Sequence, residues 1–125
     1  MDHSKLYETA AAMVAPGKGI LAADESTRTM NKRLASINVP QEAENRRKFR
    51  QLLFTAPDIE KHLSGVILYD SSIRNATDDG TAFPDVLMSR GIIPGIKVDK
   101  GTVPLTNFPD EVVTEGLDGL KERLE

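Results

Sequence analysis

The sequence predicts an α/β fold with a parallel sheet, because short apolar runs alternate along the chain with segments of helical pattern. Three runs have the length and apolar character of buried strands, at residues 19–24, 65–69 and 92–98. The run at 65–69 does not alternate between apolar and polar residues, which is typical of a strand covered on both faces. Strands that alternate with helices are joined by right-handed crossovers into one parallel sheet.

Composition narrows the class of protein. The chain has 125 residues, 39% hydrophobic and 28% charged, with a net charge of -3, which suits one globular domain and argues against a nucleic-acid partner. The sequence has no cysteine, which excludes thiolate chemistry and fits a cytoplasmic location. His3 and His62 lie far apart with no ligand-like partner, so we expect no metal site. The apolar runs are shorter than the ~18–20 residues that span a membrane.

The first two helices are predicted around the first strand. Residues 4–15 are rich in alanine, with Ser4 as a plausible N-cap, and Pro16-Gly17 ends this helix. A polar stretch at 25–29 follows the first strand. A short helix is then predicted over residues 30–37.

Two more helices are predicted on either side of the second strand. Pro40 suits the first turn of the third helix, and Pro57 ends it. One apolar face of this helix follows from helical spacing: Phe49, Leu52, Leu53 and Ala56. Residues 78–80, Asp-Asp-Gly, mark a turn, and a fourth helix is predicted from Phe83 to its end at Gly91.

The end of the sequence suggests an incomplete fold. A loop follows the third strand, and a last helical face is then predicted from Val113, Leu117, Leu120 and Leu124. This helix is still in phase where the sequence ends, and three parallel strands leave two open sheet edges. An eight-stranded α/β barrel needs about 250 residues. We therefore expect residues 1–125 to be a single partial domain, the front part of a larger protein or a truncated product.

Candidate functional residues follow the strands, because ligand sites in α/β proteins lie at the carboxyl ends of strands. Asp24 directly follows the first strand and could accept a proton or a hydroxyl hydrogen bond, or could instead cap the next helix. Lys97 lies at the end of the third strand. It could bind phosphate or act as an amine, or could instead extend its head into water.

Two basic patterns are weaker. Gly17-Lys18-Gly19 precedes its strand and lacks the full phosphate-loop motif, so it indicates a turn. The basic residues near the start of the third helix are Arg46, Arg47, Lys48 and Arg50. Because they spread around the helix and Glu42 and Glu44 lie within reach, they predict a solvated face.

A series of stretches resembles one known family in the same order along nearly the whole chain. They are APGKGILAADES at 15–26, KRL at 32–34, ENRR at 44–47, RQLL at 50–53, GVIL at 65–68, DDG at 78–80, GIKVDKG at 95–101 and GLDGL at 116–120. This set is similar to class I fructose-bisphosphate aldolases. The resemblance implies the N-terminal portion of a (β/α)₈ TIM barrel, with about three of its parallel strands.

The resemblance also implies a function. Such enzymes cleave fructose 1,6-bisphosphate reversibly to dihydroxyacetone phosphate and glyceraldehyde 3-phosphate in glycolysis and gluconeogenesis. They use a lysine Schiff base as an electron sink and no metal or other cofactor. The family's strand-one aspartate, a catalytic residue, matches Asp24. Phosphate-binding positions match Ser26, Thr29 and Arg33, and Lys97 matches an active-site lysine, expected to bind phosphate or another charge.

Two departures from the family matter. Residues 70–72, Asp-Ser-Ser, replace a His/Glu-containing pattern and receive no assigned role. The family's Schiff-base lysine lies on later strands, and neither Lys97 nor Lys100 matches it. We therefore expect this chain alone to be inactive, whereas the full-length protein would be a homo-oligomer. The alternatives are a non-catalytic half-barrel that associates through its open edges, or a small phosphate-binding module.

Overall fold

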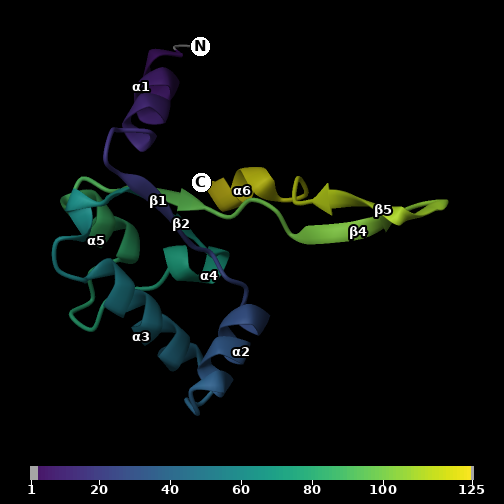
Figure 1. Ribbon diagram of the computed structural model, residues 1–125, viewed down its shortest axis with the longest axis horizontal. Helices are drawn as coiled ribbons and strands as arrows, with labels where there is room; N and C mark the ends of the chain where they lie inside the picture. The colour runs from purple at the N-terminus through teal and green to yellow at the C-terminus, as the bar shows by residue number, and fades with distance from the viewer. Residues whose placement is uncertain (1–2, 125) are drawn as a thin grey trace.

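The structure, a computed structural model that describes residues 3–124, confirms the predicted parallel sheet (Figure 1). Its strands are β1 (Gly19–Ala23), β2 (Leu63–Leu68) and β3 (Ile93–Ile96), paired in the order β1-β2-β3. β2 lies in the centre and is largely buried on both faces, as its apolar sequence predicts. The predicted α/β class is therefore correct, with strand ends shifted by one or two residues.

The helices before and between the strands are α1 (Ser4–Met13), α2 (Thr27–Ser36), α3 (Ala43–Phe54), α4 (Asp70–Ile73) and α5 (Phe83–Ser89), with a 3-10 turn at Ile59–Lys61. Ser4 is the first residue of α1 and not its N-cap, which is His3. α2 begins before the predicted residue 30, because the Ser26 hydroxyl accepts a hydrogen bond from the Thr29 amide and caps the helix.

α3 differs from its prediction at both its start and its face. Pro40 lies outside the helix, where its carbonyl accepts a hydrogen bond from the Asn45 side chain. Leu52, assigned to the apolar face, is 69% exposed, whereas Phe54 is fully buried. The buried face is therefore rotated from the predicted one.

The core lies between one face of the sheet and helices α3 and α5. Its members are Ala23, Phe54, Val66, Leu68, Phe83, Leu87 and Ile92. The rings of Phe54 and Phe83 meet edge to face with centroids 5.1 Å apart, a favourable arrangement for aromatic pairs. The other face of the sheet is not covered by these helices, and Ile20, which lies on that face, is 43% exposed.

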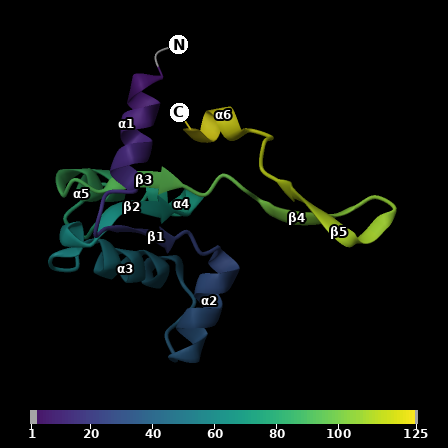
Figure 2. The same ribbon diagram turned by 45° about the horizontal axis from the view of Figure 1, so that its top comes forward.

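The segment after β3 contradicts the predicted loop and long helix. It forms an antiparallel hairpin of β4 (Gly101–Leu105) and β5 (Phe108–Glu115), which projects from the rest of the molecule in Figures 1 and 2. Asn107 adopts φ +69° at the turn, a conformation that Asn tolerates. Helix is confined to α6 (Leu120–Leu124), and Leu117 is 85% exposed.

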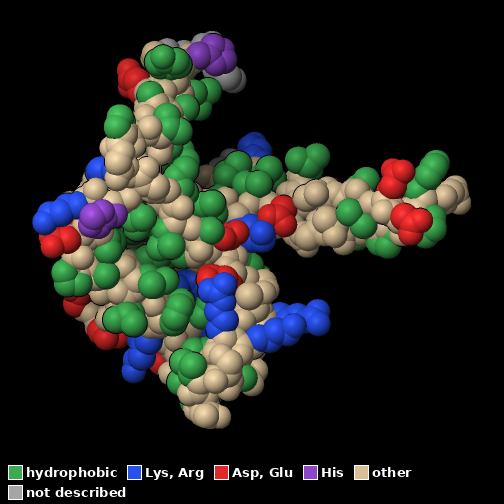
Figure 3. Space-filling view, viewed as in Figure 1, with side chains coloured by type: hydrophobic (Ala, Val, Ile, Leu, Met, Phe, Trp, Pro, Cys, Tyr) green, Lys and Arg blue, Asp and Glu red, His purple; other side chains and the backbone are tan. Residues whose placement is uncertain are grey.

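Every residue of β5 is exposed, and large apolar side chains are exposed both on the hairpin and near the start of the chain (Figure 3). Those on β5 are Phe108, Val112 and Val113, and those near the start are Leu6 and Tyr7 on α1 and Val14 just after it. No helix within residues 3–124 is long and apolar enough to cross a bilayer.

Candidate functional site

The carboxyl edge of the sheet brings Asp24, Tyr69 and Lys97 together. The last paired positions of the three strands are Ala23, Leu68 and Ile96. Side chains alternate across a sheet, so the next residue of each strand points to the opposite face from the core. All three residues line one cleft of about 900 Å³.

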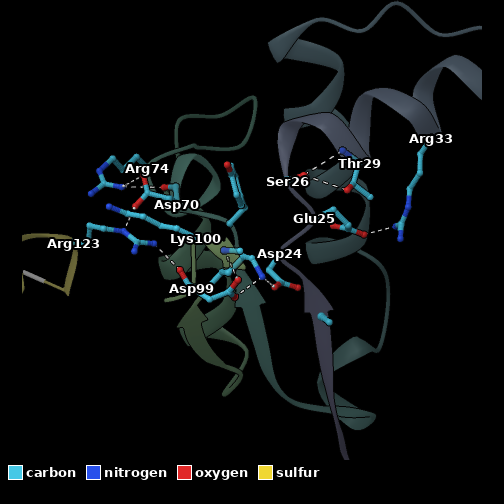
Figure 4. Close-up of a pocket in the computed structure, with 14 residues that line it drawn as sticks. Asp24, Glu25, Ser26, Thr29, Arg33, Asp70, Arg74, Asp99, Lys100 and Arg123 are labelled. Atoms are coloured by element: carbon cyan, nitrogen blue, oxygen red, sulfur yellow. Dashed lines mark hydrogen bonds and ion pairs between the residues drawn. The ribbon is translucent and has the colours of Figure 1, made fainter. Parts of the chain in front are cut away.

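The cleft is lined by all five residues that were predicted for the site. Asp24, Ser26, Thr29, Arg33 and Lys97 all line it. In Figure 4, Ser26, Thr29 and Arg33 lie on one side, and Asp24 and Asp99 lie near the middle. These residues therefore share one cleft at the strand ends, while their catalytic and binding roles remain predictions.

Lys97 is the central cation of the cleft. Its Nζ lies 2.6 Å from Asp99 Oδ2 and 3.4 Å from Asp24 Oδ2. The hydrogen bond with Asp99 and, to a lesser degree, the Asp24 carboxylate raise the pKa of Lys97 above its ordinary value. The same bond lowers the pKa of Asp99. Lys97 is therefore suited to hold an anion as an ammonium and poorly suited to attack a carbonyl as a neutral amine.

Asp24 does not cap a helix. The N-cap of α2 is Ser26, so the alternative prediction that Asp24 caps this helix is wrong. The Asp24 side chain is 23% exposed and pairs with Lys97 across the sheet. A carboxylate held beside a cation in a half-buried cleft can accept a hydrogen bond or a proton from a bound hydroxyl group.

The first turns of α2 supply hydroxyl groups and a second cation. The Ser26 and Thr29 hydroxyls lie 3.2 Å apart at the N-terminal end of α2. Arg33, one turn further on, forms an ion pair with Glu25 and leaves its side chain 55% exposed. Hydroxyl groups, backbone amides at a helix start and a guanidinium are groups that bind phosphate.

Arg50 corrects one sequence-based assignment. The sequence predicts a solvated basic face that includes Arg50, yet Arg50 is only 3% exposed. Its Nε donates to the Ala23 carbonyl at 3.2 Å, and its Nη2 donates to the Glu25 carbonyl at 2.7 Å. Arg50 therefore holds the backbone on both sides of Asp24. For Lys48 the prediction is correct, since its side chain is 59% exposed and pairs with Glu44. Arg47 also pairs with Glu44, but it is only 17% exposed and donates to the Ala76 carbonyl at 2.8 Å, so it is not on a solvated face.

The opposite side of the cleft carries charged residues that sequence reasoning left unassigned. They are Asp70, Arg74, Lys100 and Arg123 (Figure 4). Burial opposes ionisation of Asp70, but hydrogen bonds from Arg123 and Arg74 outweigh it and lower the pKa of this carboxyl. Asp70 lies two residues after the end of β2, in the region that the strand-end rule indicates. Arg123 gave no such signal, because it comes from the segment beyond the hairpin.

Comparisons with known proteins agree with the predicted family. The family model "Glycolytic", described as Fructose-bisphosphate aldolase class-I, matches residues 5–125. A probable fructose-bisphosphate aldolase class 1 of Xanthomonas axonopodis pv. citri is 56% identical over 100% of this chain and 37% of its own length. The cytoplasmic isozyme of Cicer arietinum is 55% identical over 97% of this chain and 34% of its own length.

A solved structure shows the same fold. It is the fructose-bisphosphate aldolase of Plasmodium falciparum in complex with TRAP and a small-molecule inhibitor, with a TM-score of 0.90 and 44% identity. The match covers 95% of this chain and 34% of that one. The chain thus spans about a third of the length of the relatives it matches. The predicted fold, part of a (β/α)₈ barrel, is confirmed, and the chain belongs to the class I fructose-bisphosphate aldolase family.

Proposed function

We propose that this chain supplies the Asp24–Lys97 side of a site that cleaves fructose 1,6-bisphosphate reversibly to dihydroxyacetone phosphate and glyceraldehyde 3-phosphate. The observation that carries the proposal is the juxtaposition of Asp24 and Lys97 across β1 and β3, inside a cleft large enough for a sugar phosphate. Asp24 takes the proton of the substrate hydroxyl group whose carbon takes part in the carbon–carbon bond that breaks. The electron pair of that bond passes to an imine formed by a lysine elsewhere in the protein.

Phosphate binding is assigned to Ser26, Thr29, Arg33 and Lys97. The hydroxyls of Ser26 and Thr29 lie at the start of α2, and Lys97 lines the same cleft. Arg33, whose side chain is 55% exposed, reaches a phosphate by releasing Glu25, which is 12% exposed and still has Arg50 Nη2 at 3.7 Å.

The 125-residue chain on its own is expected to have negligible cleavage activity. Lys97 is held as an ammonium by two carboxylates, and the resemblance places the imine-forming lysine on later strands. We would purify the 125-residue chain and the protein expressed from its intact gene, and measure cleavage of fructose 1,6-bisphosphate by each. Turnover that borohydride abolishes is expected only from the latter.

Two results would contradict this assignment. Robust, borohydride-sensitive turnover by the 125-residue chain would show that it holds its own nucleophile. A protein from the intact gene that binds but never cleaves sugar bisphosphates would refute the proposed reaction. Circular dichroism of both samples separates a folded, inactive chain from an unfolded one.

We extend the proposal to the setting of the enzyme. Residues 1–125 form one partial domain of a protein that acts in the cytoplasm and assembles as a homo-oligomer. Relatives named as cytoplasmic and cytosolic isozymes support the location. Subcellular fractionation and analytical ultracentrifugation of the protein from its intact gene test these two points.

A non-catalytic association module is the second candidate, and the outer strands of the sheet favour it. β1 and β3 are the edges of the described sheet, and α1 buries none of its residues. Such edges pair readily with another chain. A defined oligomer of the folded 125-residue chain, formed with rising concentration, would support this function, whereas a monomer would exclude it.

A further inference from the structure

Arg123 reaches the cleft from α6 and joins the ends of two strands. Its Nη2 donates to the Lys97 carbonyl at 2.7 Å, and its Nη1 donates to the Val98 carbonyl at 2.9 Å. Its Nε donates to Asp70 Oδ1 at 3.3 Å. The side chain is 18% exposed. One planar guanidinium thus binds the backbone after β3 and the carboxylate after β2 at the same time.

These bonds fix the peptide from which Lys97 extends. The Lys97 amide donates to the Leu68 carbonyl of β2 at 2.9 Å, while its carbonyl accepts from Arg123. From this peptide the Lys97 side chain extends so that its Nζ lies 2.6 Å from Asp99 and 3.4 Å from Asp24. Because hydrogen bonds weaken steeply with distance and angle, a small shift of this peptide would disturb both pairings.

The segment after the hairpin is held close to the same backbone. Gly116 packs so tightly that a Cβ atom there would lie 2.5 Å from the Val98 carbonyl oxygen. Lys100 Nζ donates to the Asp118 carbonyl at 3.0 Å. Both contacts hold the segment between β5 and α6 against the backbone that follows β3. Arg123, which lies in α6, is thereby kept beside the end of β3.

We propose that Arg123 is a positioning residue, which holds the Lys97 ammonium between Asp24 and Asp99 by fixing the Lys97 peptide. The inference deepens the proposed function, on which the role of Lys97 in phosphate binding rests. Asp70 in turn orients the guanidinium through Nε. Arg123 acts through the backbone and touches no reacting atom.

The sign of the charge effect makes this testable. A nearby cation disfavours a second cation, so removal of the Arg123 charge alone would raise the pKa of Lys97. Loss of positioning has the opposite effect, because the bonds to Asp99 and Asp24 that raise the pKa of Lys97 would loosen. The facing groups that set this balance are Asp24 and Asp99, with Lys100 and Arg123 in the same cleft.

The experiment is competitive acetylation of lysines with trace acetic anhydride from pH 7 to pH 11, read by peptide mass spectrometry. It uses the protein expressed from its intact gene, with exposed Lys61 as the internal reference. Arg123→Gln is expected to raise the labelling of Lys97 relative to Lys61 by about threefold at pH 8–9, the effect of about half a pKa unit. Arg74→Gln is the matched control, because Arg74 also pairs with Asp70 but bonds to the Asp70 carbonyl rather than to β3.

Unchanged or reduced labelling of Lys97 in Arg123→Gln would overturn the proposal, and so would an equal rise in Arg74→Gln. Arg123→Lys serves if the glutamine variant does not fold. It keeps the charge but lacks the planar guanidinium whose three nitrogens reach the two carbonyls and Asp70, so the same rise is expected and its absence overturns the proposal. Cleavage assays of these variants are expected to show a higher KM with kcat little changed. A parent protein without cleavage activity refutes the proposed function but leaves the labelling result intact.

Discussion

Replacing Asp24 with asparagine is expected to lower kcat for fructose 1,6-bisphosphate cleavage by about 10²–10⁴-fold, the contribution of a positioned acid or base. The amide has the same shape but cannot take the hydroxyl proton, and it no longer balances the Lys97 ammonium 3.4 Å away. The measurement is steady-state kinetics of the protein expressed from its intact gene. KM is expected to change less than kcat, because phosphate binding rests on other residues.

Asp85→Asn is the matched control for this change. Asp85 undergoes the same chemical replacement on an exposed turn of α5, away from the cleft. Its kcat is expected to stay within about twofold of the parent value, as for most surface substitutions. An Asp24→Asn enzyme that retains kcat within tenfold of the parent would remove Asp24 from the catalytic machinery.

Replacing Arg50 with methionine is expected to destabilise the fold by about 3–5 kcal/mol, the cost of breaking a buried charge network. The substitution leaves the Ala23 and Glu25 carbonyls and the Glu25 carboxylate, 3.7 Å from Arg50 Nη2, without their buried partner. Urea unfolding followed by circular dichroism measures the change. The backbone around Asp24 would loosen as well, so activity is expected to fall before global unfolding.

Lys48→Met separates burial from charge in this test. Lys48 is on the same helix, but its side chain is 59% exposed and lies 3.7 Å from Glu44. Such a surface pair contributes about 0–1 kcal/mol. If both variants unfolded at the same urea concentration as the parent protein, Arg50 would not be the structural anchor described here.

The sheet and the position of the site followed from local patterns in the sequence. A short, continuous apolar run such as 65–69 is typical of a buried strand. The strand-end rule then predicts that Asp24 and Lys97 lie at the same edge of the sheet. The register of the strands brings the two residues close together, since each lies one residue beyond the last paired position of its strand.

The hairpin and the buried arginine did not follow from local patterns. β5 is exposed along its whole length, so its sequence does not alternate between apolar and polar residues as a half-buried strand does. The leucines at 117, 120 and 124 have helical spacing and therefore predicted a helix instead. The β-branched residues Val112, Val113 and Thr114 of β5 were the available signal. Arg50 meets Ala23 only through tertiary packing of residues 27 positions apart, which helical spacing does not reveal.

The imine-forming lysine is the most direct test of the central claim. The protein from the intact gene would be incubated with dihydroxyacetone phosphate, where a lysine amine and the ketone form an imine and release water. Borohydride reduces that imine to a stable secondary amine, and peptide mass spectrometry identifies the modified lysine. We expect one modified lysine, and we expect it to lie outside the 125-residue sequence. Modification of Lys97 or Lys100, or no trapping at all, would contradict this account.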